Sequence, residues 1–369
     1  MRQSLIIARL TIIIFITVLS SELVQAEDQK VTMTEISLIE TGGRTDFVEI
    51  DDEIAYIFDF EKGFFVYDIH NPWKPVLLDS LSYNNYVDPP IHGGHDFVIQ
   101  DSLAIIDFTH SGIKIVNIEN PRNLEVIGSY NSGGEYYHID VFDNLIYCAK
   151  SIDGLEILDI SSPTDPVKVG EFSNGHGLFF ITVHDQIAYV CDLDQKQTLC
   201  LNISDPSNII ELNQLEWQAR KMKFIDEIGY IGYFTLKRGL GIYNFSDPLN
   251  PVLLSELYDG GNVHDIKIRE HYLFIADHAD GIEVIDVQHS KNPVEIAQWN
   301  NGGEFTNLDT INNLIIAADQ LNGSRILLID GLNLGEISYF TKTTPGWTFL
   351  LLIFGILSLN IFYRKKPKF

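Results

Sequence analysis

Apolar positions along most of the chain occur in short runs of four to seven residues that are separated by turn-forming residues. Segment 264–299 shows the pattern best, with runs at 264–268, 272–276, 282–287 and 294–299. These runs are rich in Val, Ile, Tyr and Phe, and several are apolar at consecutive positions, which is typical of strands covered on both faces. We therefore expect groups of four short strands.

One unit recurs along the chain, in which Gly is followed by four mostly apolar positions and then by Asp or Asn. Copies occur at 63–68 (GFFVYD), 154–159 (GLEILD) and 281–286 (GIEVID). Four strands repeated at a period of about 43 residues predict an all-β, seven-bladed β-propeller of four-stranded antiparallel blades over residues 27–330. A two-sheet sandwich is the alternative, but its strands need not repeat in sequence. The seven units end at Asp68, Asn117, Asp159, Asn202, Asn244, Asp286 and Asp330.

The segments between units indicate where the strands end and how the ring closes. Nine of the 13 prolines follow the unit ends, where a fixed φ and a missing N–H suit a turn. Residues 34–41 read like a fourth strand, and we expect them to complete the seventh blade and remove the open sheet edges. Segment 336–340 competes for this place. If 34–41 takes it, residues 331–346 form a tether.

The repeat motif also indicates a family. A strand that ends in an acidic residue, as at 189–192 (YVCD) and 274–277 (FIAD), precedes the pattern Gly-apolar-x-apolar-apolar-Asp-Ile-x-x-Pro. Over residues 34–330 this motif and its period resemble the LVIVD repeat of bacterial and archaeal surface proteins. The resemblance implies a β-propeller on an exported protein and no settled activity or catalytic set. Unit four departs most from the pattern, at 196–198 (KQT), and we expect an altered loop there.

Both ends of the chain predict contact with a membrane. Basic residues, an apolar run over 10–19 and a small-residue cleavage site predict a secretory signal peptide at 1–26, with an uncleaved anchor as the alternative. Residues 347–363 carry no charge and predict a transmembrane helix, and the basic tail 364–369 is expected to stay cytoplasmic. The end of the chain from Thr343 (TTPGW) onward resembles the sorting tails of the PGF-CTERM kind; a plain single-pass anchor explains the same residues.

Charge excludes one class of partner. The chain has 25 Lys and Arg against 51 Asp and Glu, a formal net charge of −26. Residues 27–346 hold 19 of these basic residues and 50 of the acidic ones, a charge of −31. Nucleic acid binding needs a clustered basic surface, so we expect no nucleic acid partner. An exported, surface-anchored ring of this kind predicts instead a cell-envelope protein or a glycan.

The first strand of each unit is expected to line the central channel. Residues two apart on a strand share a side, so two columns of side chains should face this channel and the column between them should pack between blades. That middle column is apolar in every unit. The outer column comprises Phe47, Asp96, His138, Phe180, Lys221, Asp265 and Asn307, and the deeper one Glu49, Val98, Asp140, Thr182, Lys223, Lys267 and Asp309.

These columns suggest a site at the channel mouth. Histidine and carboxylate can ligate a divalent cation or act as general acid and base, but the lysines oppose a cation, and the same side chains can instead stabilise strand ends. No nucleophile–base pair, HExxH spacing or phosphate loop is present. We expect a binding or scaffolding module without catalysis and without a cofactor; a metal-dependent binder or hydrolase-like enzyme is the alternative. The candidate ligand-binding residues are His95, Asp96, His138, Asp140, Lys221, His264 and Asp265, with Tyr86 and His92 from a longer connection in the first unit.

Loops near this mouth carry further candidate chemistry. Aromatic residues at Tyr136, Tyr137, Trp217 and Phe305 suggest anchors of the kind used at interfaces, although they also suit packing between blades. Among three sequons, Asn322 is the expected glycosylation site, because the asparagines of the other two occupy the end position of a repeat unit and are expected to be structural.

The three cysteines are too few for a disulfide framework. Cys191 and Cys200 flank one predicted hairpin symmetrically and could lie opposite each other. A disulfide between adjacent strands is strained, so we favour free thiols.

Overall fold

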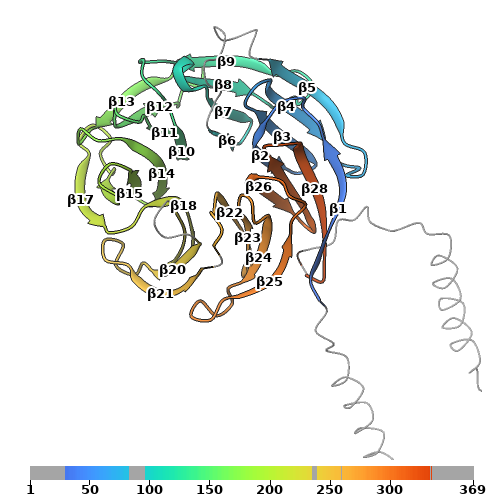
Figure 1. The fold of residues 1–369 in the computed structure, drawn as a ribbon. Coiled ribbons are helices and arrows are strands. Elements are labelled where there is room, and N and C mark those ends of the chain that lie inside the picture. Colours follow the sequence, from blue (N-terminus) through green and yellow to red (C-terminus); the bar gives the residue numbers. More distant parts are fainter. Residues whose placement is uncertain (1–29, 83–95, 235–238, 259, 333, 335–369) are drawn as a thin grey trace, which may run out of the picture.

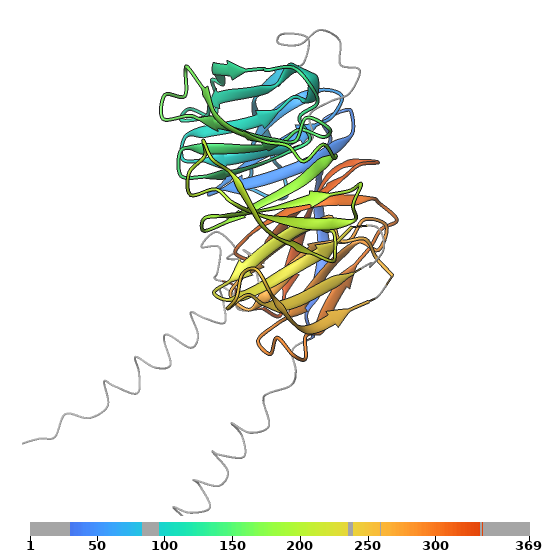
Figure 2. The same ribbon diagram turned by 90° about the vertical axis from the view of Figure 1, so that its left-hand side faces the viewer.

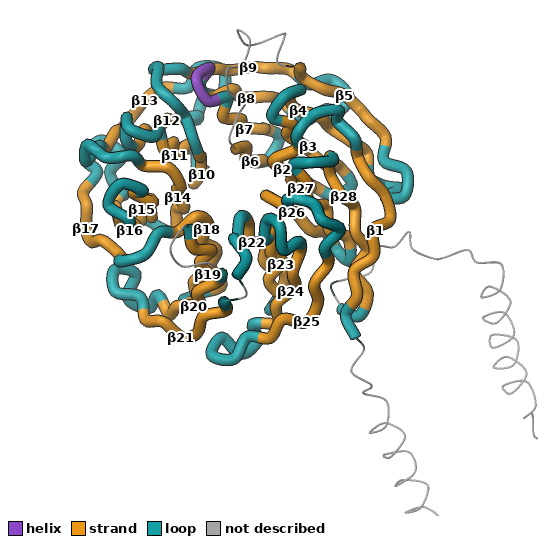
Figure 3. The backbone as a smooth tube through the Cα atoms, viewed as in Figure 1, coloured by secondary structure: helices purple, strands orange, loops and turns teal. Residues whose placement is uncertain are grey.

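Seven antiparallel sheets of four strands each surround a common centre in the computed structural model, which describes residues 30–82, 96–234, 239–258, 260–332 and 334 (Figure 1). The seven-bladed propeller expected from the repeats is confirmed. Figure 2 shows the same ring of blades after a turn of 90° about the vertical axis. The described residues include one short 3-10 helix, η2 (Thr109–Ser111) (Figure 3), and no helix long and apolar enough to cross a membrane. The expected signal peptide, transmembrane segment and basic tail lie outside the described residues.

Each blade runs from an inner strand beside the centre to an outer strand at the rim, and the sheet order follows the chain order except in the last blade. Blades 1 and 2 consist of β2 (Thr45–Asp51), β3 (Ile54–Asp59), β4 (Gly63–Asp68) and β5 (Val76–Ser82), then β6 (Asp96–Gln100), β7 (Leu103–Asp107), β8 (Ile113–Asn117) and β9 (Glu125–Tyr130). Blades 3 and 4 consist of β10 (His138–Phe142), β11 (Leu145–Ala149), β12 (Leu155–Asp159) and β13 (Val167–Phe172), then β14 (Leu178–His184), β15 (Ile187–Asp192), β16 (Gln197–Asn202) and β17 (Ile210–Leu215). Blades 5 and 6 consist of β18 (Ala219–Ile225), β19 (Ile228–Tyr233), β20 (Leu240–Asn244) and β21 (Val252–Leu257), then β22 (Asp265–Arg269), β23 (Tyr272–Ala276), β24 (Ile282–Asp286) and β25 (Val294–Trp299). Blade 7 consists of β26 (Phe305–Ile311), β27 (Leu314–Asp319), β28 (Gly323–Asp330) and β1 (Thr32–Ile39).

The first two strands of every blade are joined by a two-residue turn whose first residue has a positive φ. Asp and Asn tolerate this left-handed conformation better than most residues with a side chain, and six of the seven turns use one of them. The turn chemistry therefore explains why an acidic residue recurs between these strands. The residues are Asp52, Asp101, Asp143, Asp185, Asp226, Glu270 and Asn312.

Strand β1 closes the ring by pairing with β28, so that the beginning of the described chain completes the last blade. The pairing is antiparallel and extends from Thr32 opposite Asp330 to Ile39 opposite Ser324. Arg325 of β28 joins Glu35 of β1 at 3.0 Å and Asp319 of β27 at 3.1 Å. The competing segment 336–340 lies outside the described residues. Because β1 and β28 come from opposite ends of the described chain, their pairing joins the first and last blades into a closed ring.

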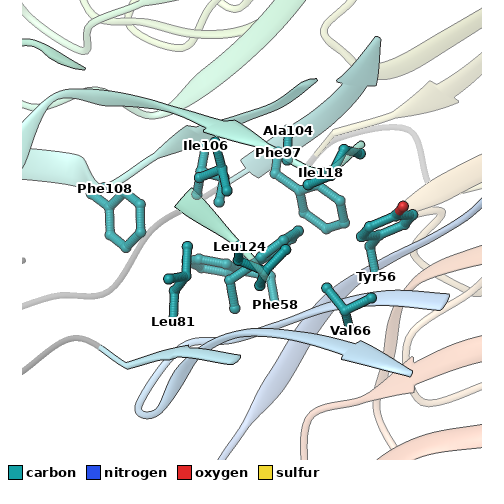
Figure 4. Close-up of a cluster of buried hydrophobic side chains, with 12 residues drawn as sticks. Tyr56, Phe58, Val66, Leu81, Phe97, Ala104, Ile106, Phe108, Ile118 and Leu124 are labelled. Carbon is teal, nitrogen blue, oxygen red and sulfur yellow. The ribbon is translucent and has the colours of Figure 1, made fainter. Parts of the chain in front are cut away.

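The described part of the hydrophobic core forms seven clusters, and each lies between two neighbouring blades. Figure 4 shows the cluster between blades 1 and 2. There Phe64 and Phe97 meet edge to face with ring centroids 5.3 Å apart. Burying one such side chain stabilises the fold by roughly 1.5–3 kcal/mol. The apolar middle column of the inner strands belongs to this core: Val48, Phe97, Ile139, Ile181, Met222, Ile266 and Leu308 are each at most 2% exposed.

The proline turns contact the outer strand of the preceding blade. Every outer strand has a shifted register, which marks a bulge. At or beside these bulges Ser37 Oγ donates to the Pro72 carbonyl at 2.5 Å, and Gly170 lies against the carbonyl of Pro206. The turns that follow the unit ends thus form part of the contact between blades, in addition to ending the strands.

Candidate functional site

Two adjoining cavities occupy the centre of the ring, and the inner strands line both of them. The first, of about 220 Å³, lies where the inner strands begin, and we call it the mouth pocket. The second, of about 100 Å³, lies deeper. Four residues line both cavities. The mouth pocket is lined by Arg44, Asp46, Phe47, Tyr137, His138, Phe180, Arg220, Lys221, His264, Asp265, Thr306, Asn307 and Gln320.

The structure brings together the described members of the predicted site. His138, Lys221, His264 and Asp265 line the mouth pocket, and Asp96 and Asp140 line the deeper cavity. His95, together with Tyr86 and His92, lies outside the described residues.

The carboxylates of the channel accept hydrogen bonds from the backbone of the next blade, a role that the sequence pattern did not predict. Each inner strand leaves backbone N–H groups unpaired towards the centre, because it is the edge of its sheet. Side chains from the preceding blade accept these hydrogen bonds. Asp140 accepts from the Val183 N–H at 2.7 Å, and Asp309 accepts from the Ile50 N–H at 2.8 Å. Equivalent bonds run from Ile99 N–H to Glu49, Ile139 N–H to Asp96, Leu308 N–H to Asp265, and Val48 N–H to Asn307.

Lysines neutralise part of this acidic ring. Lys221 lies 3.4 Å from Asp265, and Lys267 lies 3.7 Å from Asp309 and 3.8 Å from Glu49. Burial alone would raise the pKa of Asp265, but Lys221 and its neighbouring lysines lower it below the ordinary value. Burial would likewise lower the pKa of Lys267, but Asp309 and Glu49 raise it. Both groups are therefore charged at neutral pH and hold blades 5, 6, 7 and 1 together.

Among the predicted site residues, Asp96 and His264 have pKa values that are shifted far from the ordinary ones. Burial raises the pKa of Asp96 to about 7, while Lys221 acts in the opposite direction. His138 Nε2 lies 3.3 Å from Asp96 Oδ2. Burial lowers the pKa of His264 to about 2, with Arg220 and His278 acting in the same direction. His264 is therefore a neutral imidazole at physiological pH, and its Nε2 lies 3.1 Å from Asn262 Nδ2.

The metal alternative finds no ligand cluster in the part of the chain that the structure describes. No three His, Cys, Asp or Glu side chains among those residues converge in a way that could hold an ion. His138 and His264 both line the mouth pocket, but they belong to strands of blades 3 and 6.

Bulges at the start of four inner strands place further residues in the mouth pocket, of which the sequence pattern had singled out Phe180 alone. The register shifts in β2, β14, β18 and β26, and it is regular in the other three inner strands. A bulge adds one residue and re-aims a side chain. The bulged strands form two neighbouring pairs on opposite sides of the centre (Figure 3). The bulge residues that line the pocket are Asp46, Phe180, Arg220 and Thr306.

The proposed aromatic anchors are only partly where we expected them. Tyr137 lines the mouth pocket. Tyr136 and Phe305 are fully buried, and the Tyr136 hydroxyl donates to Glu156 at 2.7 Å. Trp217 is half-buried against Tyr243, at a centroid distance of 5.4 Å. The expectation of surface anchors was therefore wrong for Tyr136 and Phe305, because these rings fill space between blades.

Cys191 and Cys200 do not lie opposite each other. Their partners across the hairpin of β15 and β16 are Thr198 and Tyr189, because the turn is one residue away from symmetric. All three cysteines are free and buried. Asn322 is exposed in the turn between β27 and β28, a position that a glycan can reach.

Comparison with known proteins supports the fold and the repeat. The LVIVD repeat profile matches residues 42–84, 133–174 and 260–301. The computationally designed protein Ika8 has a similar structure, with a TM-score of 0.57 at 10% identity over 81% of this chain and 99% of that one. BamB from Moraxella catarrhalis is also similar, with a TM-score of 0.51 at 14% identity over 80% of this chain and 97% of that one. No curated protein matches the sequence. The chain is therefore a seven-bladed β-propeller that contains LVIVD repeats.

Proposed function

We propose that this protein is an exported binding module, anchored in the membrane by residues 347–363, which presents the mouth pocket to a ligand or partner of the cell envelope. The observation that carries the proposal is the asymmetry of the mouth. Seven similar units could line the channel in the same way, yet four inner strands are bulged and three are regular. Bulges are over-represented beside functional sites, and here their residues line one pocket.

The chemistry of the pocket supports binding. In the deeper channel, the carboxylates of Glu49, Asp96 and Asp140 each accept a backbone N–H from the next blade and so have a structural role. The mouth pocket combines aromatic walls with polar groups, which is typical of ligand sites. The signal peptide at 1–26 and the basic tail at 364–369 support a location outside the membrane for the propeller. A glycan on Asn322 is part of the same proposal.

Placement of a photo-crosslinking residue tests the binding face. In cells that express the full chain, p-benzoylphenylalanine at Tyr137 reports on the mouth, and the same residue at Trp73 is the matched control. Trp73 is 49% exposed in a turn at the opposite ends of the strands. We expect a specific envelope adduct from Tyr137 and none from Trp73. Equal adducts from both positions, or an adduct from Trp73 alone, would contradict the proposal.

Protease treatment of intact cells tests the topology. A protease outside the cell should digest the propeller and leave an epitope tag at the C-terminus intact. Protection of the propeller, with recovery of the protein as a soluble cytoplasmic species, would contradict the anchored arrangement.

A further inference from the structure

The lining of the mouth pocket has a surplus positive charge, although the whole chain has a net charge of −26. Two carboxylates occur among the described lining residues, and each already has cationic or amide partners. Asp46 accepts from Arg44 at 3.0 Å and from Gln320. Asp265 lies 3.4 Å from Lys221 and accepts from an amide. Among the lining residues that the structure describes, the remaining cation is Arg220, at the bulge of β18.

Arg220 is held without a carboxylate. Within the described ranges, no ion pair or hydrogen bond joins its guanidinium to another group. Its Cζ lies 5.4 Å from the ring centroid of Phe180 and 5.7 Å from that of Phe234. Burial lowers the pKa of Arg220 to about 10, so the group keeps its charge at neutral pH. A partly desolvated cation with no anionic partner favours an incoming anion.

The walls beside Arg220 are aromatic. Phe180 lies between Tyr137 and Phe234, with centroid distances of 5.7 Å and 5.3 Å. Phe47 lines the pocket from blade 1. Aromatic faces hold an apolar or aromatic body, and the planar guanidinium fork matches a carboxylate in two parallel hydrogen bonds. The volume of about 220 Å³ equals that of about seven water molecules at roughly 30 Å³ each, which suits one small organic group.

We propose that the mouth pocket binds a carboxylate attached to an aromatic or apolar body, with Arg220 pairing the carboxylate and Phe180, Tyr137 and Phe47 contacting the body. This inference rests on the proposed function, because it names the ligand chemistry of that same pocket. The carboxylate comes either from a free small acid or from the C-terminus of a protein partner. Both sources present the same group to Arg220, so the experiment includes a probe for each.

The test compares acids with their uncharged amides on the purified full chain in mild detergent. Phenylacetate and phenylacetamide differ only in charge and in one polar atom. Isothermal titration calorimetry measures the affinity of each. We expect phenylacetate to bind at least about tenfold more tightly, since a charge-assisted pair with Arg contributes that much or more. The tripeptide Gly-Gly-Phe and its C-terminal amide repeat the comparison for the protein source. A free-acid preference in either pair supports the proposal and identifies the source.

Variants then assign the preference to Arg220. In Arg220→Gln we expect the acid to bind no better than the amide, and in Arg220→Lys an intermediate preference. Arg122→Gln is the matched control, because Arg122 is exposed in a turn at the other ends of the strands, and it should bind as the wild type does. Equal binding of acid and amide by the wild-type chain would overturn the proposal even if Arg220→Gln fails to fold. So would undiminished acid binding by a folded Arg220→Gln variant, or no acid binding at 10 mM ligand.

The outcome separates this inference from the proposed function. If the crosslinker at Tyr137 gives its adduct while no acid preference exists, the pocket binds a ligand of other chemistry and only the carboxylate inference fails. If the adduct is also absent, the proposed function fails as well.

Discussion

Removal of the Asp140 carboxylate tests whether the acidic residues of the channel hold neighbouring blades together. In Asp140→Ala, the Val183 N–H of the next blade loses an acceptor at 2.7 Å and the Val141 N–H loses one at 2.9 Å. A donor left unsatisfied in a buried place costs about 1–3 kcal/mol. Burial raises the pKa of Asp140, so the loss of a disfavoured charge offsets part of that cost. We expect a net destabilisation of about 1–2 kcal/mol.

Thr182→Ala provides the matched control for this measurement. Thr182 lines the same deeper cavity, and its side chain has no hydrogen bond to the other described residues. We expect a change below about 0.5 kcal/mol. Urea denaturation of the full chain, followed by circular dichroism, gives both free energies of unfolding. If Asp140→Ala is no more destabilised than Thr182→Ala, the carboxylate does not join blades 3 and 4, and the reasoning is refuted.

Three further changes test the ring closure, the outer contact and the buried acid. Arg325→Ala leaves the buried Asp319 carboxylate without its cation and should cost about 3–5 kcal/mol of unfolding free energy. Glu35→Gln removes only the partly exposed pair between β28 and the closing strand β1 and should cost less than about 1 kcal/mol. Equal losses in urea denaturation would contradict the greater contribution of the buried pair. Gly170→Ala places a Cβ 1.9 Å from the Pro206 carbonyl oxygen and should destabilise the chain by about 1–3 kcal/mol. A wild-type unfolding midpoint would rule out the close contact between blades. Since burial raises the pKa of Asp96 to about 7, its contribution to stability is present below pH 4 and lost as the pH rises through 7. Asp96→Asn removes this titration, so its stability relative to the wild type should increase between pH 4 and pH 8, and a constant difference would show that Asp96 keeps an ordinary pKa.

The sequence predicted the blades, their order and the two channel-facing columns, because these follow from regular periods. A unit of about 43 residues with four apolar runs specifies a propeller blade. Alternation along a strand then places Lys221 and Lys223 on the side opposite Met222. The structure has these residues where the pattern puts them, with both lysines lining the deeper cavity and Met222 1% exposed.

The bulges and the contacts between blades could not be predicted in this way. Strict alternation would place Arg220 on the same side as Met222, between blades. The bulge between Ala219 and Lys221 is what turns this position towards the pocket. The length of the strand reflects the bulge, since the four bulged inner strands have seven residues and the other three have five. The acceptor role of Asp140 depends on how blade 3 meets blade 4, which no local pattern encodes. The burial of Tyr136 and Phe305 depends on the same packing.

The central claim is that the carboxylates of the charged centre join neighbouring blades, whereas Arg220 binds the ligand. Titration of phenylacetate into Arg220→Gln and Asp140→Ala, with urea denaturation of the same samples, tests this division most directly. The account predicts that Arg220→Gln loses at least about tenfold in affinity with an unchanged free energy of unfolding. Asp140→Ala should be less stable and bind phenylacetate as the wild type does. Wild-type affinity in a folded Arg220→Gln, or loss of both properties together in each variant, would contradict the account.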